Sequence, residues 1–246
     1  MNAVLILGGT AEARALAAEL HGARIPVISS LAGRVRDPAL PVGDVRIGGF
    51  GGPAGLADYL RAHRIRAVVD ATHPFATGMS ASAAAACTAA EVPLLRLARP
   101  GWADHPLAGG WQWVDGPAEA VRAAAGRRVL LTTGRRTLDE FAVLDAPFVL
   151  VRLVDPVSAD LPAEWSVLTS RGPYTVPGEL ALLREHRIEL LVTKDSGGQM
   201  TEPKLLAAQQ LGVRVVVLRR PAAETGVPAV STVSETVGWV RSTVEG

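Results

Sequence analysis

The sequence alternates short β-branched runs with turns rich in Gly, Ser or Thr and with alanine-rich stretches of helical character, from one end to the other. This alternation predicts parallel sheets covered by helices. The apolar runs do not alternate with polar residues, which is typical of strands buried on both faces. The expected strands cover residues 3–7, 25–29, 44–47, 67–71, 94–97, 111–114, 129–132, 148–153, 166–169, 189–193 and 213–218. The expected helices cover residues 11–21, 53–62, 77–90, 117–125, 137–143, 177–186, 201–210 and 234–242.

The stretch ARPGWADHPLAGG, residues 98–110, interrupts this pattern with Pro, Gly and Trp. Such a break is typical of a crossing between domains. Two α/β units with about four or five strands each explain the sequence better than one sheet of about ten strands. We therefore expect a first domain over residues 1–98 and a second domain over residues 99–246.

The composition limits the functional classes. The chain is 48% hydrophobic and 20% charged, which indicates a globular protein. With 25 basic and 24 acidic residues it has no electrostatic footprint for nucleic acid or an anionic membrane. Cys87 is the single cysteine, so neither an internal disulfide nor the Cys/His spacing of a metal site is expected. The sequence lacks a basic stretch before its first apolar run and a membrane-length apolar segment, so we expect a cytoplasmic protein.

The first turn, in VLILGGTAEARALAAEL, resembles a dinucleotide-binding turn but lacks two of its three glycines. With Gly9 as the middle glycine, the outer positions hold Leu7 and Glu12. Glycines let the backbone approach a ligand closely, and the N-terminus of the following helix attracts a phosphate. Thr10 can cap that helix or donate its hydroxyl to the phosphate. The alternative is that Gly-Gly-Thr serves the geometry of the turn alone.

The end of the second strand distinguishes between two cofactors. An NAD-binding unit usually places Asp or Glu there, whereas an NADP-binding unit prefers a hydroxyl and an arginine for the extra phosphate. The sequence VISSLAGRVRDP places Ser29 and Ser30 at this point, with Arg34 and Arg36 just beyond. If a dinucleotide binds, we expect NADP(H), with the planar fork of Arg34 on its phosphate. The alternative is a solvated, arginine-rich loop.

Two further loops follow the third and fourth strands. VRIGGFGGP surrounds Phe50 with four glycines, which suits either close passage of a flat ligand or a flexible loop. VVDATHPFA places Asp70 at the end of an apolar run, where a buried carboxylate needs hydrogen-bond partners and could simply brace the loop. His73 in the same loop could donate a proton near neutral pH, or it could be structural.

Three strands of the second half end in turns that pair hydroxyls with cations. These turns are TTGRRT with Arg135 and Arg136, TSRGPY with Arg171, and TKDSGGQMT with Lys194, Ser196 and Gly197. Because the carboxyl ends of parallel strands share one edge of a sheet, the turns predict a site for an anionic, polycarboxylate ligand. A P-loop and a nucleophile elbow are both absent from the sequence.

Together these motifs closely resemble the precorrin-6A reductase family, the NADPH-dependent reductases of cobalamin biosynthesis. The resemblance rests on LILGGTAEARALA, SSLAGRV, VRIGGFGG, VVDATHPFA, LLRLARPGW, LTTGR, SRGPY, LLREHRIELLVTKDSGG and KLLAAQQLGVRVVVLRRP, in this order, from about residue 3 to about residue 240. It implies two Rossmann-like domains, with the dinucleotide on the N-terminal one and the tetrapyrrole in the active-site cleft between them.

The resemblance also implies roles for individual residues. Those expected at NADPH are Gly9, Thr10 and Ala11 at the pyrophosphate, Ser30 and Arg34 at the 2′-phosphate, Gly49 and Phe50 at the adenosine, and His73, Pro74 and Phe75 at the nicotinamide. Those expected at the substrate carboxylates are Arg135, Arg171, Lys194, Ser196 and Gly197. His73, Lys194, Asp195 and water are the candidates for the proton donor.

The implied reaction is reduction of one double bond of precorrin-6A to give precorrin-6B, by hydride from NADPH plus a proton. Catalysis would depend mainly on positioning, with cations stabilising negative charge that develops on the ring. A tetrapyrrole is the implied partner, and hand-over to neighbouring pathway enzymes stays open. Two alternatives also remain: a cobalt-precorrin-6A reductase of the anaerobic pathway, and a non-catalytic module that senses NADPH.

Overall fold

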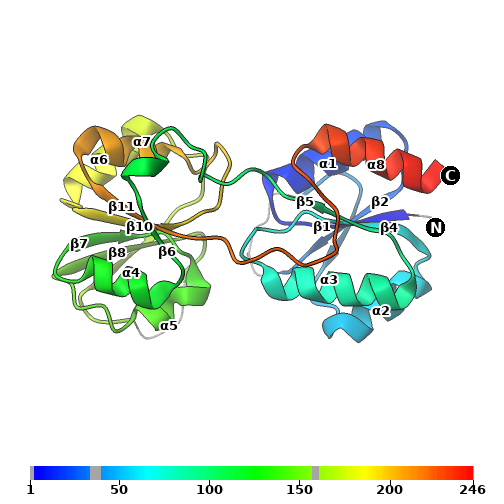
Figure 1. Ribbon diagram of the computed structural model, residues 1–246, viewed down its shortest axis with the longest axis horizontal. Coiled ribbons are helices and arrows are strands. Elements are labelled where there is room, and N and C mark those ends of the chain that lie inside the picture. The colour runs from blue at the N-terminus through cyan, green and yellow to red at the C-terminus, as the bar shows by residue number, and fades with distance from the viewer. Residues whose placement is uncertain (1–2, 34–39, 157–160, 246) are drawn as a thin grey trace. The chain divides into compact units, whose positions relative to one another are not determined.

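Two parallel sheets of six strands each organise residues 3–33, 40–156 and 161–245, the residues that the computed structural model describes (Figure 1). Unit 1 contains residues 1–100 and 221–246, and unit 2 contains residues 101–220. The expected α/β class is confirmed, although each sheet has six strands rather than four or five. Within the described part of the chain, no helix is long and apolar enough to cross a membrane.

Unit 1 is a doubly wound sheet. Its strands lie in the order β3 (Asp44–Ile47), β2 (Val27–Leu31), β1 (Ala3–Leu7), β4 (Ile65–Asp70), β5 (Leu94–Leu97) and β12 (Ala229–Val230). The helices α1 (Ala11–Gly22) and α8 (Val233–Glu245) cover one face, and α2 (Gly52–Ala62) and α3 (Thr77–Ala90) cover the other (Figure 1). The chain builds outward from β1 to β3, then returns beside β1 at β4 and builds the opposite way.

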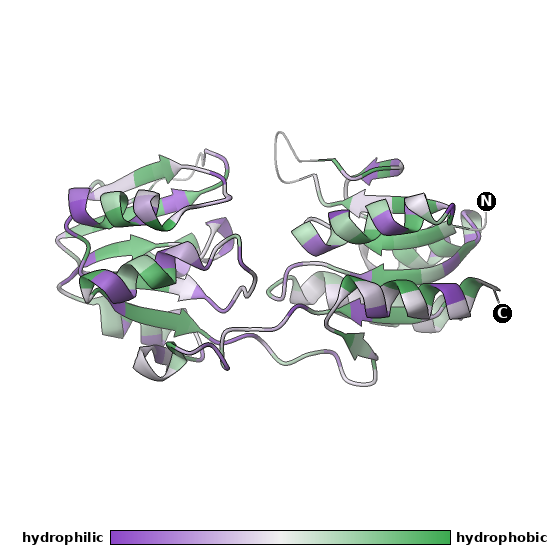
Figure 2. Cartoon of the chain, turned by 90° about the horizontal axis from the view of Figure 1, so that it is seen from above, coloured by the Kyte–Doolittle hydropathy of each residue, from purple (hydrophilic) through white to green (hydrophobic). Residues whose placement is uncertain are grey.

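The central strand β1 is buried on both faces. Val4 and Ile6 pack in the cluster that contains α1 and α8, whereas Leu5 and Leu7 pack in the cluster that contains α2 and α3. A strand covered on both sides has no solvent-facing position, which explains the uninterrupted apolar run. Figure 2 shows the same concentration of hydrophobic residues in the strands.

The C-terminal segment belongs to unit 1. β12 pairs with β5, and Val240 of α8 is fully buried in the cluster that contains Leu16 of α1. A capping box begins α8: Thr232 Oγ1 accepts from the Glu235 amide, and the Glu235 carboxylate accepts from the Thr232 amide. The pKa of Glu235 is lowered by hydrogen bonds from the Thr232 hydroxyl first, and then from the amides of Thr232 and Ser231. The first boundary lies inside the expected break, but residues 221–246 do not join the second unit as the expected domain 99–246 required.

Unit 2 repeats the same strand order with its own helices. Its strands lie in the order β9 (Trp165–Thr169), β8 (Phe148–Leu153), β7 (Arg128–Leu131), β10 (Leu190–Lys194), β11 (Arg214–Leu218) and β6 (Gln112–Val114). Its α-helices are α4 (Pro117–Ala124), α5 (Leu138–Phe141), α6 (Val176–Glu185) and α7 (Pro203–Leu211), and its 3₁₀ turns are η1 (Ala108–Gly110) and η2 (Arg135–Thr137). α6 and α7 cover one face of the sheet, and α4 and α5 cover the other (Figure 1).

Two expected elements differ from the structure near the candidate site. β2 begins at Val27 rather than residue 25, because Pro26 has no N–H for the ladder; its carbonyl accepts from the Val4 amide. The expected helix over 137–143 is only η2 followed by the four-residue α5. There the Thr137 hydroxyl donates to Thr133 Oγ1, a local side-chain bond that competes with a longer helix.

Candidate functional site

The reversal of strand order in unit 1 lies between β1 and β4. Leu7 at the end of β1 pairs with Asp70 at the end of β4, and the Ala71 amide donates to the Leu7 carbonyl at 2.9 Å. Ligands of doubly wound sheets bind at this kind of switch point, beyond the carboxyl ends of the strands. The glycine turn after β1 and the loop after β4 therefore lie where a ligand is expected.

The glycine turn leads directly into a capped helix. Gly9 has φ +112°, a conformation that favours glycine, and a Cβ there would meet no atom within 4 Å. Thr10 Oγ1 accepts from the Ala13 amide at 3.1 Å as the N-cap of α1, and donates to the Ala71 carbonyl at 2.8 Å. The hydroxyl of Thr10 thus caps the helix and ties the two loops of the switch point together. The peptide N–H groups of the first turn of α1 remain the groups suited to an anion.

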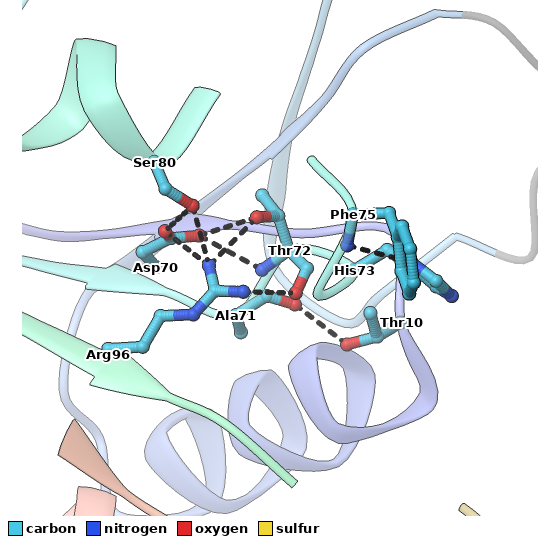
Figure 3. A network of polar contacts seen from close by, with 8 residues as sticks. All are labelled: Thr10, Asp70, Ala71, Thr72, His73, Phe75, Ser80 and Arg96. Carbon is cyan, nitrogen blue, oxygen red and sulfur yellow. Dashed lines mark hydrogen bonds and ion pairs between the residues drawn. The ribbon is translucent and has the colours of Figure 1, made fainter. Parts of the chain in front are cut away.

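Asp70 braces the loop after β4, as one of the two interpretations of the sequence predicted. Its buried carboxylate accepts from the Thr72 amide at 3.0 Å, the Thr72 hydroxyl at 2.7 Å and the Ser80 hydroxyl at 2.6 Å, and forms an ion pair with Arg96 (Figure 3). Arg96 on β5 also donates to the Thr72 carbonyl at 3.1 Å. This network joins β4, β5 and α3 and fixes the start of the loop.

His73 and Phe75 lie together in the same loop (Figure 3). The Phe75 amide donates to His73 Nδ1 at 3.2 Å, and the two ring centroids are 5.8 Å apart. Because Nδ1 is the acceptor, the neutral ring carries its proton on Nε2. Pro74 lies between the two residues, so the predicted nicotinamide contacts form one short segment at the switch point.

Arg46 is a cation at the end of β3 that sequence reasoning missed. Its Nη1 donates to the Gly48 carbonyl and its Nη2 to the Gly49 carbonyl, each at 2.6 Å, and Nη1 also reaches Ser30 Oγ at 3.4 Å. The guanidinium lies 3.7 Å from the Phe50 ring centroid. The signal that could have identified it is an arginine two residues before the glycine-rich loop that starts at Gly48.

Packing contacts fix the loop around Phe50 against β3 and α2. Besides its contact with Arg46, the Phe50 ring packs edge-on against Tyr59 with centroids 5.1 Å apart. A Cβ at Gly55 of α2 would lie 1.9 Å from the Phe50 carbonyl oxygen, so the backbone of the loop approaches the helix where only glycine fits. These contacts argue against the interpretation of this segment as a flexible loop.

Ser29 and Ser30 lie inside β2, which ends one residue later at Leu31. Ser29 Oγ is buried and has no hydrogen-bond partner among the described residues, whereas Ser30 Oγ is the group near Arg46. The predicted phosphate ligand Arg34 lies outside the described residues.

Glu12 and Arg99 form an ion pair beside the glycine turn. Glu12 is in the first turn of α1, Arg99 follows β5, and Arg99 Nη1 lies 2.8 Å from Glu12 Oε2. The pair is mostly shielded from solvent. It places a neutralised carboxylate next to the predicted phosphate position.

In unit 2, cations follow the strands at the corresponding reversal of strand order. β7 and β10 are neighbours, so η2 with Arg135 and Arg136 and the end of β10 with Lys194 lie at one edge of the sheet. Burial lowers the pKa of Lys194 below its ordinary value, the Arg136 guanidinium lowers it further, and Glu140 opposes this. Ser196 and Gly197 follow after Asp195, and the Ser196 amide donates to the Lys194 carbonyl at 2.7 Å.

The turn that carries Arg171 follows the edge strand β9, two strands away from β7. A buried ion pair between Arg152 of β8 and Glu179 of α6 lies beneath this turn, and the Arg152 guanidinium is 4.1 Å from the Tyr174 ring centroid. Tyr174 in turn donates its hydroxyl to the Ser170 carbonyl at 3.0 Å. Sequence reasoning missed this support, although a charged residue within the apolar run FVLVRL was its signal.

Asp195 joins the two ends of unit 2. Its buried carboxylate accepts from the Trp102 amide at 2.8 Å and lies 3.4 Å from Arg220 Nε, and Arg220 also donates to the Asp195 carbonyl. Trp102 and Arg220 lie next to the residues where the chain enters and leaves this unit. The oxygens of Asp195 are thus already engaged by structural partners.

Comparisons with known proteins agree with one another over the whole chain. The family model described as precorrin-6x reductase CbiJ/CobK matches residues 3–241. A precorrin-6A reductase of Rhodococcus erythropolis is 49% identical, with 98% of each chain covered, and one of Mycobacterium tuberculosis is 50% identical, also with 98% of each covered. A solved structure of CobK precorrin-6A reductase superposes with a TM-score of 0.90 at 39% identity, covering 99% of this chain and 97% of that one. The chain therefore belongs to the precorrin-6x reductase CbiJ/CobK family.

Proposed function

We propose that this protein reduces precorrin-6A to precorrin-6B with NADPH, by hydride transfer to a ring double bond and protonation. Unit 1 would bind the dinucleotide, and the loops of unit 2 would bind the carboxylates of the tetrapyrrole. The observation that carries the proposal is the dinucleotide-type switch point of unit 1, with Gly9, Thr10 and the capped α1, in a chain that matches precorrin-6A reductases over its length.

The residues of unit 1 fit NADPH. Gly9 leaves open space where a side chain would be, and the N-terminus of α1 with Thr10 and Ala11 offers peptide N–H groups to the pyrophosphate. Ser30 is a hydroxyl at the strand end where an NAD site has a carboxylate. We assign Gly49 and Phe50 to the adenosine, and His73, Pro74 and Phe75 to the nicotinamide. When bound, NADPH supplies the hydride.

The loops of unit 2 suit a polyanionic substrate. Arg135, Arg171 and Lys194 follow three strands of one sheet at the same edge, and Ser196 and Gly197 extend the last of these turns. Arginine binds carboxylates through its planar fork, whereas lysine acts as a compact charge. We propose that these residues hold the acetate and propionate groups and orient the ring for the hydride.

Among the candidates for the proton donor, we favour Lys194. Its ammonium lies in the cationic edge of unit 2, and its lowered pKa brings it nearer to the range in which an ammonium gives up a proton. His73 remains a second candidate through its Nε2 proton. The carboxylate of Asp195 is engaged by Trp102 and Arg220, so we propose that it braces the chain instead.

The comparisons favour precorrin-6A over its cobalt-containing counterpart as the substrate. The chain is 49–50% identical to the precorrin-6A reductases of Rhodococcus erythropolis and Mycobacterium tuberculosis, but 29% identical to the cobalt-precorrin-6A reductase of Priestia megaterium and 30% identical to that of Salmonella typhimurium. The cationic loops of unit 2 speak against a module that only senses NADPH, because such a sensor needs no second anion site.

The test is anaerobic incubation of the protein with precorrin-6A and either NADPH or NADH, following the loss of nicotinamide absorbance. We expect rapid oxidation of NADPH, slower oxidation of NADH, and formation of precorrin-6B. A parallel reaction with cobalt-precorrin-6A distinguishes the two substrates. If neither nucleotide is oxidised while an authentic reductase turns over the same substrate, the proposed function is wrong.

A further inference from the structure

We propose that Arg46 is a specificity-determining residue that binds the 2′-phosphate of NADPH through the Nε and Nη2 edge of its guanidinium, next to the strand that carries Ser30. This inference rests on the proposed function, because it names a further part of the same cofactor site. It adds a residue of β3 that the dinucleotide motif does not contain.

The register of the sheet brings the two residues together. Ser30 on β2 pairs with Arg46 on β3, so their side chains lie on the same face of neighbouring parallel strands. Arg46 Nη1 is 3.4 Å from Ser30 Oγ. The carboxyl end of β2 is where doubly wound folds distinguish a ribose hydroxyl from a phosphate. Arg46 therefore places a positive charge at the position that decides between NADH and NADPH.

The guanidinium is held in place by neutral groups. The edge formed by Nη1 and Nη2 donates to the carbonyls of Gly48 and Gly49, each at 2.6 Å, and Phe50 lies under one face at 3.7 Å. Phe50 is itself fixed by Tyr59 and by the close approach of its carbonyl to Gly55. A pre-oriented arginine loses less side-chain freedom when it binds an anion.

The remaining edge of the guanidinium suits a phosphate. Arginine has five N–H donors; Nε–H and the second Nη2–H point the same way, and neither donates to an acceptor among residues 3–33, 40–156 and 161–245. Across these same residues, no carboxylate forms an ion pair with Arg46. Among the described residues, the guanidinium of Arg46 thus has no ion-pair partner, and its remaining fork matches two phosphate oxygens.

The test compares the affinities of Arg46→Ala, Arg46→Lys and the wild type for NADPH and for NADH, measured by titration calorimetry. We expect Arg46→Ala to weaken the binding of NADPH about 10- to 100-fold, as the loss of hydrogen bonds to a charged group predicts. The binding of NADH should weaken only about threefold, because the loop around Phe50 loosens. Arg46→Lys keeps the charge but loses the fork, so its NADPH affinity should lie between. The matched control is Arg61→Ala on α2, an exposed arginine paired with the exposed Asp58.

The ratio of the two affinities decides the outcome. Selective loss of NADPH binding supports the proposal, and 2′,5′-ADP should then lose affinity in parallel while 5′-ADP does not. Equal weakening of NADPH and NADH would mean that Arg46 only supports the glycine loop, and would overturn it, as would unchanged NADPH binding. Failure of the proposed function is a separate result: the wild type would prefer NADPH in the titration but leave precorrin-6A unreduced.

Discussion

Unit 1 and unit 2 have the same strand order but different loops at the carboxyl ends of their strands. In unit 1 the central strand β1 leads into a glycine turn and the twelve-residue helix α1. In unit 2 the corresponding strand β7 leads into η2 and the four-residue α5. A long capped helix presents N–H groups and a dipole to a phosphate, whereas unit 2 presents arginine and lysine side chains.

The two units also differ in where the chain supplies the edge strand beside β5 or β11. β12 of unit 1 comes from the C-terminal segment, after the whole of unit 2, whereas β6 of unit 2 directly follows the entry of the chain into that unit. Both strands complete a sheet of the same design. Equal strand order therefore fixes where a site lies, and the loops decide what it binds.

Each unit contains an ion pair between an arginine and a buried carboxylate: Arg96 with Asp70 in unit 1, and Arg152 with Glu179 in unit 2. Breaking the pair of unit 2 should have the largest effect on stability. Glu179→Ala would leave the guanidinium of Arg152 buried without its partner, which costs about 3–5 kcal/mol of the free energy of unfolding. Chemical denaturation measures this cost. We expect weaker substrate binding because the turn with Arg171 loses its support, and unchanged NADPH affinity because unit 1 is intact.

The control for this prediction removes both charges at once. Arg152→Met combined with Glu179→Leu leaves no unpaired charge, so its loss of stability should be clearly smaller than that of Glu179→Ala. A double variant as unstable as the single one would show that packing, rather than charge, holds this turn.

Lys194→Met tests the cationic edge of unit 2. It removes the charge but keeps most of the length of the side chain, so we expect kcat/KM for precorrin-6A to fall about 10²- to 10³-fold, the usual effect of losing one group that stabilises a developing charge. The affinity for NADPH should not change. A large loss of NADPH affinity would contradict the division of roles between the units.

The pH dependence of the rate tests whether Lys194 is the proton donor. Since its pKa lies below the ordinary value, a reaction that needs the ammonium slows as the pH rises through that lowered pKa. Arg136→Gln removes a cation that lowers the pKa, so the alkaline limb should move to higher pH. Glu140→Gln should move it to lower pH. Rate profiles that coincide for all three proteins would exclude this lysine as the proton donor.

The sequence predicted the parts of the fold that depend on local pattern. The turn at Gly9, the cap at Thr10 and the central strands follow from residues close together in the chain. β12 could not be predicted, because two residues carry no periodic signal and their partner β5 is more than 130 residues earlier. The return of α8 to unit 1 depends on packing against α1 in the same way.

The residues of the candidate site also differ in whether local sequence pattern could identify them. His73 and Lys194 could be proposed from the sequence because each lies at or just after the end of a strand, in a segment rich in polar residues. Arg46 and Arg152 were missed because their partners, Ser30 and Glu179, are distant in sequence and meet only through strand register and helix packing. The role of Asp195 could not be judged from the sequence, since Trp102 and Arg220 lie far from it in the chain.

Thr10 and Thr132 allow a direct comparison of the two switch points. Each hydroxyl donates to a carbonyl of the neighbouring strand segment, Thr10 to Ala71 and Thr132 to Val192. Thr10→Val also removes the cap of α1, at a cost of about 1 kcal/mol, and should weaken NADPH about fivefold. Thr132→Val should leave NADPH binding unchanged. Thr10→Ser retains the hydroxyl and should restore the affinity measured by titration.

The smallest expected effect concerns the ion pair beside the glycine turn. Arg99→Ala would expose the pyrophosphate to the unpaired carboxylate of Glu12, a partly screened repulsion worth about 0.5–1 kcal/mol, so NADPH and NADH should both bind about two- to fivefold more weakly. The equal effect on the two nucleotides separates this pair from Arg46, whose loss should weaken the binding of NADPH much more than that of NADH. In Glu12→Gln with Arg99→Ala the repulsion is gone, and affinity should return to that of the wild type. If the double variant stays as weak as Arg99→Ala, Arg99 acts on the phosphate directly rather than through Glu12.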